Sequence, residues 1–267
     1  MRFLSAKRRH RAARPLLLIL ALFFLGVVYA GFAPTGKSNA EQTTTTQVQA
    51  GKELFAVGCA SCHGLNAEGA SQGPSLIGVG AASVDFQVGT GRMPMAHPGA
   101  QAPRKNNTYT DQEIEQLAAY VASLGPGPAI PREEQYSPVG LSEHEIAIGG
   151  ELFRTNCSAC HNVSGLGGAL PNGKYAPSLV DVENKHIYEA VRIGPQQMPV
   201  FSKESLTDDE LRSVIGYLNQ LHEEPNHGGW GFGGLGPVED GFWVWIGGLG
   251  TLILFAVWIA SKGARAK

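Results

Sequence analysis

Two short motifs contain the residues of this chain that are best suited to chemistry. Each motif has the pattern Cys-x-x-Cys-His, and the residues are Cys59, Cys62, His63, Cys157, Cys160 and His161. This pattern is the attachment signature of c-type haem. Two thiols one helical turn apart can add to the two vinyl groups along one porphyrin edge, and the histidine that follows then points its imidazole at the iron. All four cysteines of the chain belong to these motifs, so none is left for a disulfide.

A Cys-x-x-Cys pair also has uses other than haem attachment. A single pair would also fit a redox dithiol or half of a zinc site. A zinc ribbon needs both cysteine pairs close together, whereas 94 residues lie between Cys62 and Cys157. The sequence therefore predicts two covalently bound haem c groups, and a zinc-binding Cys/His module without haem stays as the alternative.

Methionines offer the second axial ligand to each iron. Apart from the initiator, the chain has three of them, Met93, Met95 and Met198. Met93 and Met198 each stand directly before a proline and shortly after a glycine, which makes them the preferred pair. Met95 matches Met198 in its distance from an earlier Pro-Ser-Leu sequence and stays as an alternative to Met93. The predicted iron ligands are His63 with Met93 and His161 with Met198. Such ligation raises the haem potential and leaves no open coordination position.

Two prolines are expected to support the axial histidines. The carbonyls of Pro74 and Pro177 can accept a hydrogen bond from the outer ring nitrogens of His63 and His161, which fixes the tautomer of a metal-bound imidazole. The other histidines are expected to be surface or loop residues without a role, although His97 could compete as an axial ligand. They are His10, His97, His144, His186, His222 and His227.

The two motifs lie inside a duplicated unit. GKELF precedes the first motif and GGELF the second, at the same offset of 98 residues that separates the motifs themselves. Pro-Ser-Leu, Gly…Met-Pro and Thr-Asp-x-Glu blocks then follow in the same order in both halves. Five matching blocks indicate an internal duplication. Each half has few strand signals, so the predicted fold class is all-α.

Helices must position these motifs, and their ends can be located. Thr110 and Thr207 are predicted N-caps because a glutamate stands three residues after each, as in a capping box. Apolar residues follow at helical spacing: Ile114, Leu117, Tyr120, Val121 and Leu124 in the first half, and Leu211, Val214, Ile215, Leu218 and Leu221 in the second. We predict a first domain at residues 47–125 and a second domain at residues 141–223, joined by a Pro-rich connection. Each is too small to build a large core without a cofactor.

Apolar runs flank the two domains. Residues 1–34 are predicted to be a basic tail and a transmembrane segment, although the apolar run at 16–33 would also fit a cleaved signal sequence. Residues 242–260 are predicted to be a C-terminal transmembrane helix, because they contain no charge and have tryptophans near their ends. The positive-inside rule places the basic termini in the cytoplasm, if the first segment is not cleaved, and the two domains on the outer face of the cell membrane.

Charge is segregated along the chain. The formal net charge is -2, but all 23 acidic residues and only 12 of the 21 basic ones lie between the two apolar runs. An acidic middle region does not suit nucleic acid, which needs clustered Lys and Arg. It would suit a partner with a basic surface, or it is simply a solvated acidic surface.

Each half resembles a class I cytochrome c domain. The resemblance rests on the Gly/Phe helix before each motif, the motif itself, the Met-Pro loop and the last helix with Tyr120 or Tyr217. In that family the first and last helices cross at the glycine and aromatic positions. The whole chain is similar to a narrower family, the dihaem cytochrome c subunit of the actinobacterial cytochrome bc complex (menaquinol–cytochrome c reductase). The sequences that indicate it are GTGRMP (89–94), GGAL (167–170), GKYAP (173–177), GPQQMP (194–199) and GGLGP (233–237).

This resemblance implies a function and partners. Electrons would arrive from a Rieske iron–sulfur subunit, pass through both haems and enter a terminal cytochrome c oxidase, with the chain bound to a cytochrome b subunit in the membrane. The chain would be the electron-transfer subunit of a reductase that is also a translocase, without substrate chemistry of its own. A dihaem subunit of another membrane dehydrogenase or oxidase is the alternative.

The sequence predicts that the mature chain carries two haems through thioether bonds. Haem staining should follow the band on denaturing electrophoresis, because thioether bonds survive denaturation. The intact mass should exceed the apo mass by two haem groups. A mass with one haem or none would contradict the prediction.

Overall fold

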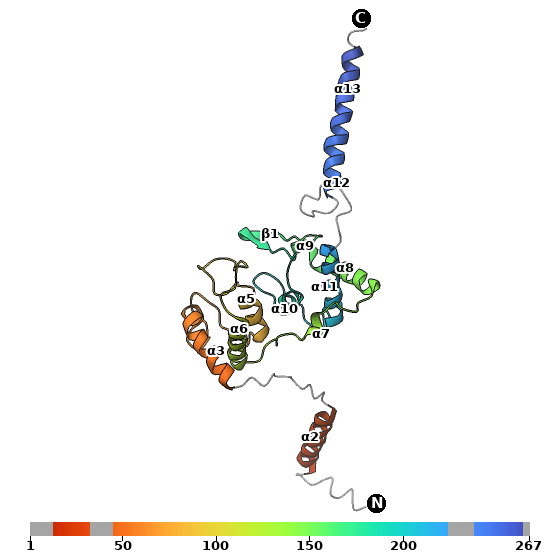
Figure 1. Cartoon of the computed structure of the whole chain (residues 1–267). Coiled ribbons are helices and arrows are strands. Elements are labelled where there is room, and N and C mark those ends of the chain that lie inside the picture. Colours follow the sequence, from red (N-terminus) through yellow and green to blue (C-terminus); the bar gives the residue numbers. More distant parts are fainter. Residues whose placement is uncertain (1–12, 33–44, 224–237, 264–267) are drawn as a thin grey trace, which may run out of the picture. The chain divides into compact units, whose positions relative to one another are not determined.

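The computed structural model describes residues 13–32, 45–223 and 238–263. The chain divides into two compact units, Met1–Gln42 and Thr43–Lys267. In the first unit the described residues form one helix, α2 (Ala13–Phe32), which is apolar along its middle. The second unit contains both predicted domains and the C-terminal helix (Figure 1).

The two domains repeat the same four helices in the same order, as the internal duplication predicted. In the first domain these are α3 (Thr45–Gly58), α4 (Ala60–His63), α5 (Ala81–Gly89) and α6 (Asp111–Ser123). In the second they are α8 (Glu143–Asn156), α9 (Ser158–His161), α10 (Asn184–Ile193) and α11 (Asp208–Glu223). The first cysteine of each Cys-x-x-Cys-His motif therefore caps a short helix that contains the rest of the motif and directly follows the first helix of its domain.

A small sheet departs from the predicted all-α class. Strands β1 (Gly168–Leu170) and β2 (Lys174–Ala176) pair antiparallel, with Ala169 opposite Tyr175; the turn between them is η1 (Pro171–Gly173). The first domain has only an isolated bridge, Ala70 to Gly73, in the corresponding loop. That loop is five residues shorter between the motif histidine and the Pro-Ser-Leu sequence. The insertion in the second domain thus forms the hairpin, and the chain is mostly rather than entirely helical.

Close helix crossings hold each domain together. A Cβ atom at Gly51 of α3 would collide with the backbone carbonyl of Gln116 in α6, and one at Gly149 of α8 with that of Ser213 in α11. Next to these glycines, Phe55 packs against Tyr120 with ring centroids 5.2 Å apart, and Phe153 against Tyr217 at 5.8 Å. The first and last helices of each domain therefore meet backbone to backbone, as the resemblance to cytochrome c domains implied.

The last helix of each domain begins at its predicted N-cap and buries its predicted apolar face. Thr110 caps α6 through a complete capping box with Glu113, and Thr207 makes the same reciprocal hydrogen bonds with Glu210 at the start of α11. Of the ten apolar residues predicted on these faces, eight are buried, and only Leu124 and Leu221 are intermediate. The two cores are separate clusters, one around Phe55 and one around Phe153.

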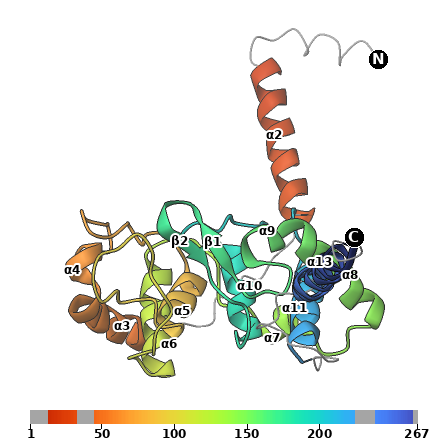
Figure 2. The same ribbon diagram turned by 90° about the horizontal axis from the view of Figure 1, so that it is seen from above.

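The Pro-rich connection packs on both domains. In its first half, the backbone carbonyl of Pro128 accepts a hydrogen bond from Ala82 of the first domain at 3.1 Å, and Ile130 packs against the first core. In its second half, α7 (Glu133–Tyr136) contacts α10 and α11, and the Gln135 side chain donates to Asp208 at 3.1 Å. Helices α5 and α10 also contact each other, so the domains lie side by side (Figure 2).

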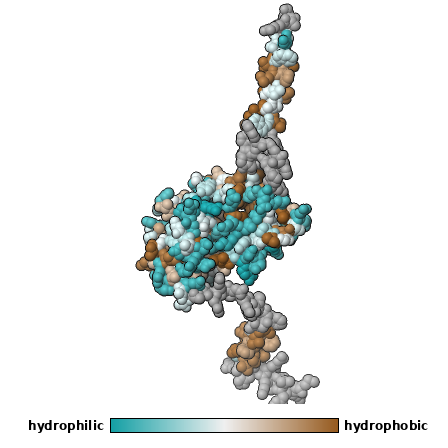
Figure 3. Space-filling model, viewed as in Figure 1, coloured by the Kyte–Doolittle hydropathy of each residue, from teal (hydrophilic) through white to brown (hydrophobic). Residues whose placement is uncertain are grey.

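The C-terminal segment is helical from α12 (Val238–Trp243) through a π-helical stretch, η2 (Val244–Leu249), to α13 (Gly250–Gly263). Residues Gly241–Gly263 form the one described helical segment that is long and apolar enough to cross a membrane by length and composition. The large apolar side chains of this segment are exposed and give it a hydrophobic surface, whereas the surface of the folded domains is mostly hydrophilic (Figure 3). The apolar part of α2, Pro15–Val28, is shorter.

The helix crossing gives a stability prediction. Overpacking costs about 1–3 kcal/mol, which exceeds the roughly 0.5–1 kcal/mol that alanine gains over glycine inside a helix. We therefore expect Gly149→Ala to lower the urea midpoint of the second domain, measured by far-UV circular dichroism on the haem-loaded chain.

Gly99→Ala is the matched control for Gly149→Ala. A Cβ at Gly99 would make only ordinary contacts, at 3.7 Å to the Gln101 carbonyl and 3.8 Å to Met95. An unchanged midpoint in Gly149→Ala would show that the helices do not meet as closely as described.

Candidate haem sites

Each Cys-x-x-Cys-His motif forms one tight helical turn. The Cys59 carbonyl accepts hydrogen bonds from the backbone N–H of Cys62 at 3.1 Å and of His63 at 3.0 Å. The Cys157 carbonyl accepts the equivalent bonds at 3.1 Å and 2.9 Å. The first cysteine in each domain also packs against the core. The two thiols of each motif are thus one turn apart, the spacing that two thioether bonds to one porphyrin edge require.

The axial histidines are oriented by proline carbonyls. Nδ1 of His63 lies 2.8 Å from the Pro74 carbonyl oxygen, and Nδ1 of His161 lies 3.0 Å from that of Pro177. A carbonyl oxygen can only accept, so Nδ1 carries the proton and Nε2 keeps its lone pair for a metal. This confirms the contact predicted for both prolines.

The loops after the motifs are built alike despite their different lengths. The backbone N–H of Gly69 donates to the His63 carbonyl at 2.7 Å, and that of Gly167 donates to the His161 carbonyl at 2.9 Å. Both glycines have positive φ, +93° and +83°, a conformation that favours glycine. The inserted hairpin of the second domain therefore leaves the proline carbonyl in the same place beside its histidine.

Burial shifts the pKa of three motif side chains, Cys59, Cys157 and His161. It raises the pKa of the Cys59 thiol to about 11, with a smaller contribution from Cys62, and that of Cys157 to about 11, with a smaller contribution from Cys160. Redox-active dithiols instead have a lowered pKa, so a dithiol function is disfavoured. Burial also lowers the pKa of His161, an effect that its bond to Pro177 opposes. A neutral imidazole is the form that binds iron.

The methionine loops reach back to the cores. Met93 packs against the core of the first domain and Met198 against that of the second. A cationic side chain holds each loop through hydrogen bonds to backbone carbonyls. In the first domain, Lys105 donates to the carbonyls of Gly91 and Pro94, the latter at 2.6 Å. In the second domain, Arg192 donates to the carbonyls of Phe201 at 3.0 Å and Leu206 at 2.7 Å, residues that follow the methionine.

Two glutamines connect the domains next to these loops, and we call this pair the glutamine clasp. The Gln101 side chain donates to the Tyr175 carbonyl at 2.6 Å and accepts from its N–H at 3.0 Å. The Gln196 side chain bonds both backbone groups of Ala102, each at 3.1 Å. The segment after Met93 is thus joined both to the hairpin and to the loop that contains Met198.

Some residues of this region were missed in the sequence. Nothing in the pattern marks Gln101 or Gln196 as a contact between the domains, because an amide that bonds the backbone of a distant loop has no local signature. The prediction that the other histidines lie on the surface or in loops is wrong for His186, which is buried in α10 with Nδ1 2.8 Å from Glu189. His97 is exposed.

Zinc coordination by the cysteines receives no support. Within the described residues, the one group of three or more His, Cys, Asp or Glu side chains close enough to share an ion is Asp85, His186 and Glu189. The cysteine pairs do not come together in such a group, because each is held in its own domain.

Comparison with protein families and relatives agrees with the two-domain reading. Residues 48–125 match the family model for cytochrome c, and residues 144–218 match that for cytochrome c oxidase, cbb3-type, subunit III. The cytochrome bc1 complex cytochrome c subunit of Corynebacterium diphtheriae is 40% identical over 96% of this chain and 96% of its own length. Its namesakes in Mycobacterium tuberculosis and Mycobacterium leprae are 40% and 42% identical, over 95% and 94% of this chain and 92% and 87% of their own lengths.

The family predicted from the loop sequences is thereby confirmed. The chain has two cytochrome c domains, and such domains support covalently bound haem c. By identity and coverage along nearly its whole length, the chain belongs to the family of cytochrome bc1 complex cytochrome c subunits.

Proposed function

We propose that this chain is the dihaem cytochrome c subunit of a membrane quinol–cytochrome c reductase. It receives electrons from a Rieske iron–sulfur subunit and passes them toward a terminal cytochrome c oxidase. The observation that carries this proposal is the pair of equivalent motif turns, each with its histidine bonded to a proline carbonyl. Family membership supplies the setting of a quinol-oxidising complex.

Each domain holds one haem c in this proposal, attached through Cys59 and Cys62 or through Cys157 and Cys160. The tandem class I domains supply His63 and Met93 to the first iron and His161 and Met198 to the second. Two observations support this assignment: Nε2 of each histidine is left free by the bond at Nδ1, and Met93 and Met198 each pack against the core of their own domain.

Such irons relay electrons and do not transform a substrate. Histidine and methionine fill both axial positions, and methionine ligation raises the potential. The chain's own residues therefore bind the haems, orient the imidazoles and hold the methionine loops. The glutamine clasp keeps the two domains together beside these loops, so an electron can pass from one domain to the other within a single chain.

The membrane anchors keep this relay beside its partners. Residues Gly241–Gly263 span the membrane, and α2 spans it as well if it is not cleaved, with both termini in the cytoplasm and the haem domains on the outer face. The anchored chain binds the cytochrome b subunit. A tethered carrier meets the Rieske protein and the oxidase at a high effective concentration, and the acidic middle region suits basic surfaces on them.

One observation favours a second candidate. The second domain matches the family model of a cbb3-type oxidase subunit, so a dihaem subunit of an oxidase is the runner-up. The two functions differ in which complex loses activity when the chain is absent.

Replacing the proposed ligand of the second iron should change one haem only. Met198→His should lower the potential of that haem by on the order of a few tenths of a volt, since axial ligands set haem potentials over about 0.8 V. The weak sulfur-to-iron absorption band should shrink in parallel. Potentiometric titration with optical detection measures both effects.

Met95→Leu is the control for the first iron. It should leave both potentials unchanged, whereas Met93→Leu should shift one of them. The reverse pattern would assign Met95 as the ligand.

Removing the C-terminal anchor should uncouple the relay. A chain that lacks residues 242–267 should be lost from the complex, and quinol-driven oxygen uptake by membranes should fall with it. The haem content of the truncated chain is the control, because the deletion leaves both domains intact. Normal quinol oxidation in cells without the whole chain would contradict the proposed function and favour the runner-up.

A further inference from the structure

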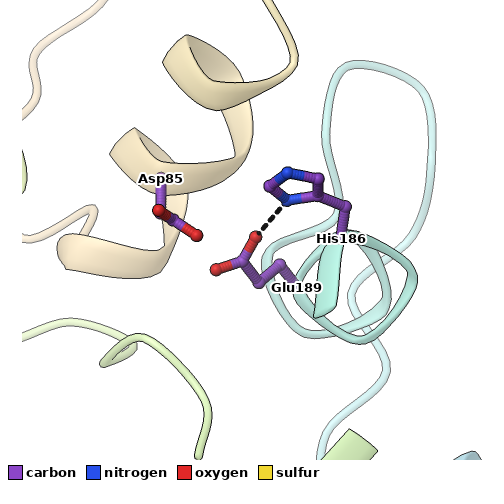
Figure 4. A group of neighbouring side chains, drawn as sticks. All are labelled: Asp85, His186 and Glu189. Atoms are coloured by element: carbon purple, nitrogen blue, oxygen red, sulfur yellow. Dashed lines mark hydrogen bonds and ion pairs between the residues drawn. The ribbon is translucent and has the colours of Figure 1, made fainter. Parts of the chain in front are cut away.

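A buried group of ligand-type side chains lies where the two domains meet. Asp85 comes from α5 of the first domain, and His186 and Glu189 come from α10 of the second (Figure 4). One donor atom from each residue lies within 4.8 Å of the others. The side chains of Asp85 and His186 are 9% exposed and that of Glu189 is 0% exposed. Two carboxylates and one imidazole form an oxygen and nitrogen donor set that suits a first-row divalent cation.

One carboxylate oxygen of this group has no hydrogen-bond partner among the described residues and could bind a metal. Nδ1 of His186 lies 2.8 Å from Oε2 of Glu189. The other oxygen, Oε1, is buried without a hydrogen-bond partner among the described residues. Figure 4 shows the Glu189 carboxyl turned toward Asp85. Two facing carboxyl groups need a proton or a cation between them, because both can only accept when ionised.

The ligand chemistry of the group allows a cation to take the place of that proton. Burial, followed by the neighbouring Asp85, raises the pKa of Glu189 to about 10, and burial lowers the pKa of His186. A neutral imidazole is ready to bind a metal, and a divalent cation can displace the carboxyl proton, as metals do at sites formed by ionisable ligands.

One positive charge already lies at this site. Nζ of Lys185 is 2.8 Å from Oδ2 of Asp85, and the lysine side chain is 30% exposed. A carboxylate has two oxygens and can hold two partners, so this ammonium weakens cation binding without blocking it. Glu183, whose side chain is 72% exposed, lies 3.9 Å from Nε2 of His186 and offsets part of that charge.

We propose that Asp85, His186 and Glu189 form a divalent-cation site, best suited to zinc, that bridges the two haem domains. The bound ion would join α5, which leads into the Met93 loop, to α10, which leads into the Met198 loop. Around the ligands, Phe86 packs edge to face against His186, with ring centroids 6.0 Å apart. This site needs neither iron ligand and does not depend on the proposed function.

Zinc content tests the proposal directly. The full-length haem-loaded chain is treated with EDTA, incubated with zinc chloride, desalted and analysed by inductively coupled plasma mass spectrometry. We expect about one tightly held zinc per chain, a higher melting temperature with zinc, and only nitrogen and oxygen ligands in the zinc-edge absorption spectrum. Wild-type chain that retains no zinc would overturn the proposal.

Two substitutions locate the ion. Glu189→Gln keeps the shape of the side chain but cannot bear the charge, and it should lower zinc affinity by at least about tenfold. Glu183→Gln, at the residue directly before the same helix, is the matched control and should retain the zinc. Equal zinc affinity in Glu189→Gln and wild type would overturn the proposal, because the ion would then lie elsewhere.

A third substitution keeps the test decisive if Glu189→Gln fails to fold. Lys185→Met removes the competing ammonium and leaves every ligand in place, so zinc affinity should rise severalfold. The haem absorption spectrum verifies the fold of each variant. Unchanged or weaker zinc binding in Lys185→Met would contradict a site that includes Asp85.

Discussion

The backbone-to-backbone crossing of the first and last helices is the contact on which each domain depends. Only a residue without Cβ permits it, at Gly51 against Gln116 and at Gly149 against Ser213. Because the motif turn continues directly from the first helix, this crossing also determines where the two thiols and the axial histidine lie. Each aromatic pair beside a glycine then extends the contact into the core. Small domains of this kind bury little apolar surface by themselves. In the proposed function, a covalently attached haem completes each core as well as providing the redox centre.

The second constraint is the joint between the domains. Each glutamine of the clasp bonds backbone groups of the other domain. These hydrogen bonds replace bonds that the same groups would otherwise make with water. The clasp lies directly between the segment after Met93 and the loop before Met198. The Pro-rich connection adds contacts to both domains. Electron transfer between the two proposed haems requires that their separation be maintained. The glutamine clasp contributes to this with neutral amide groups, which do not change charge when the irons change oxidation state.

Features of the fold and of the site were predictable from the sequence where a residue type at a given spacing has few possible functions. Cysteine pairs followed by histidine identified both attachment turns, and Thr110 and Thr207 marked the helix starts because a capping box is a local pattern. The proline carbonyl contacts were also foreseeable, since the duplication placed both prolines at matching positions.

Features that depend on contacts between residues far apart in the sequence could not be predicted. The strands of the hairpin have three residues each and are too short for an alternating pattern. The glutamine clasp and the burial of His186 depend on how the two domains meet, which no periodicity within either domain records.

In the proposed function, both haems lie on the path of electrons from quinol. Anaerobic stopped-flow spectroscopy of the intact membrane complex, mixed with a reduced quinol, tests this path. We expect two haem c equivalents per chain to become reduced at least as fast as the complex turns over in the steady state. Reduction of one haem within a turnover, with the other reduced more slowly than the complex turns over, would contradict it.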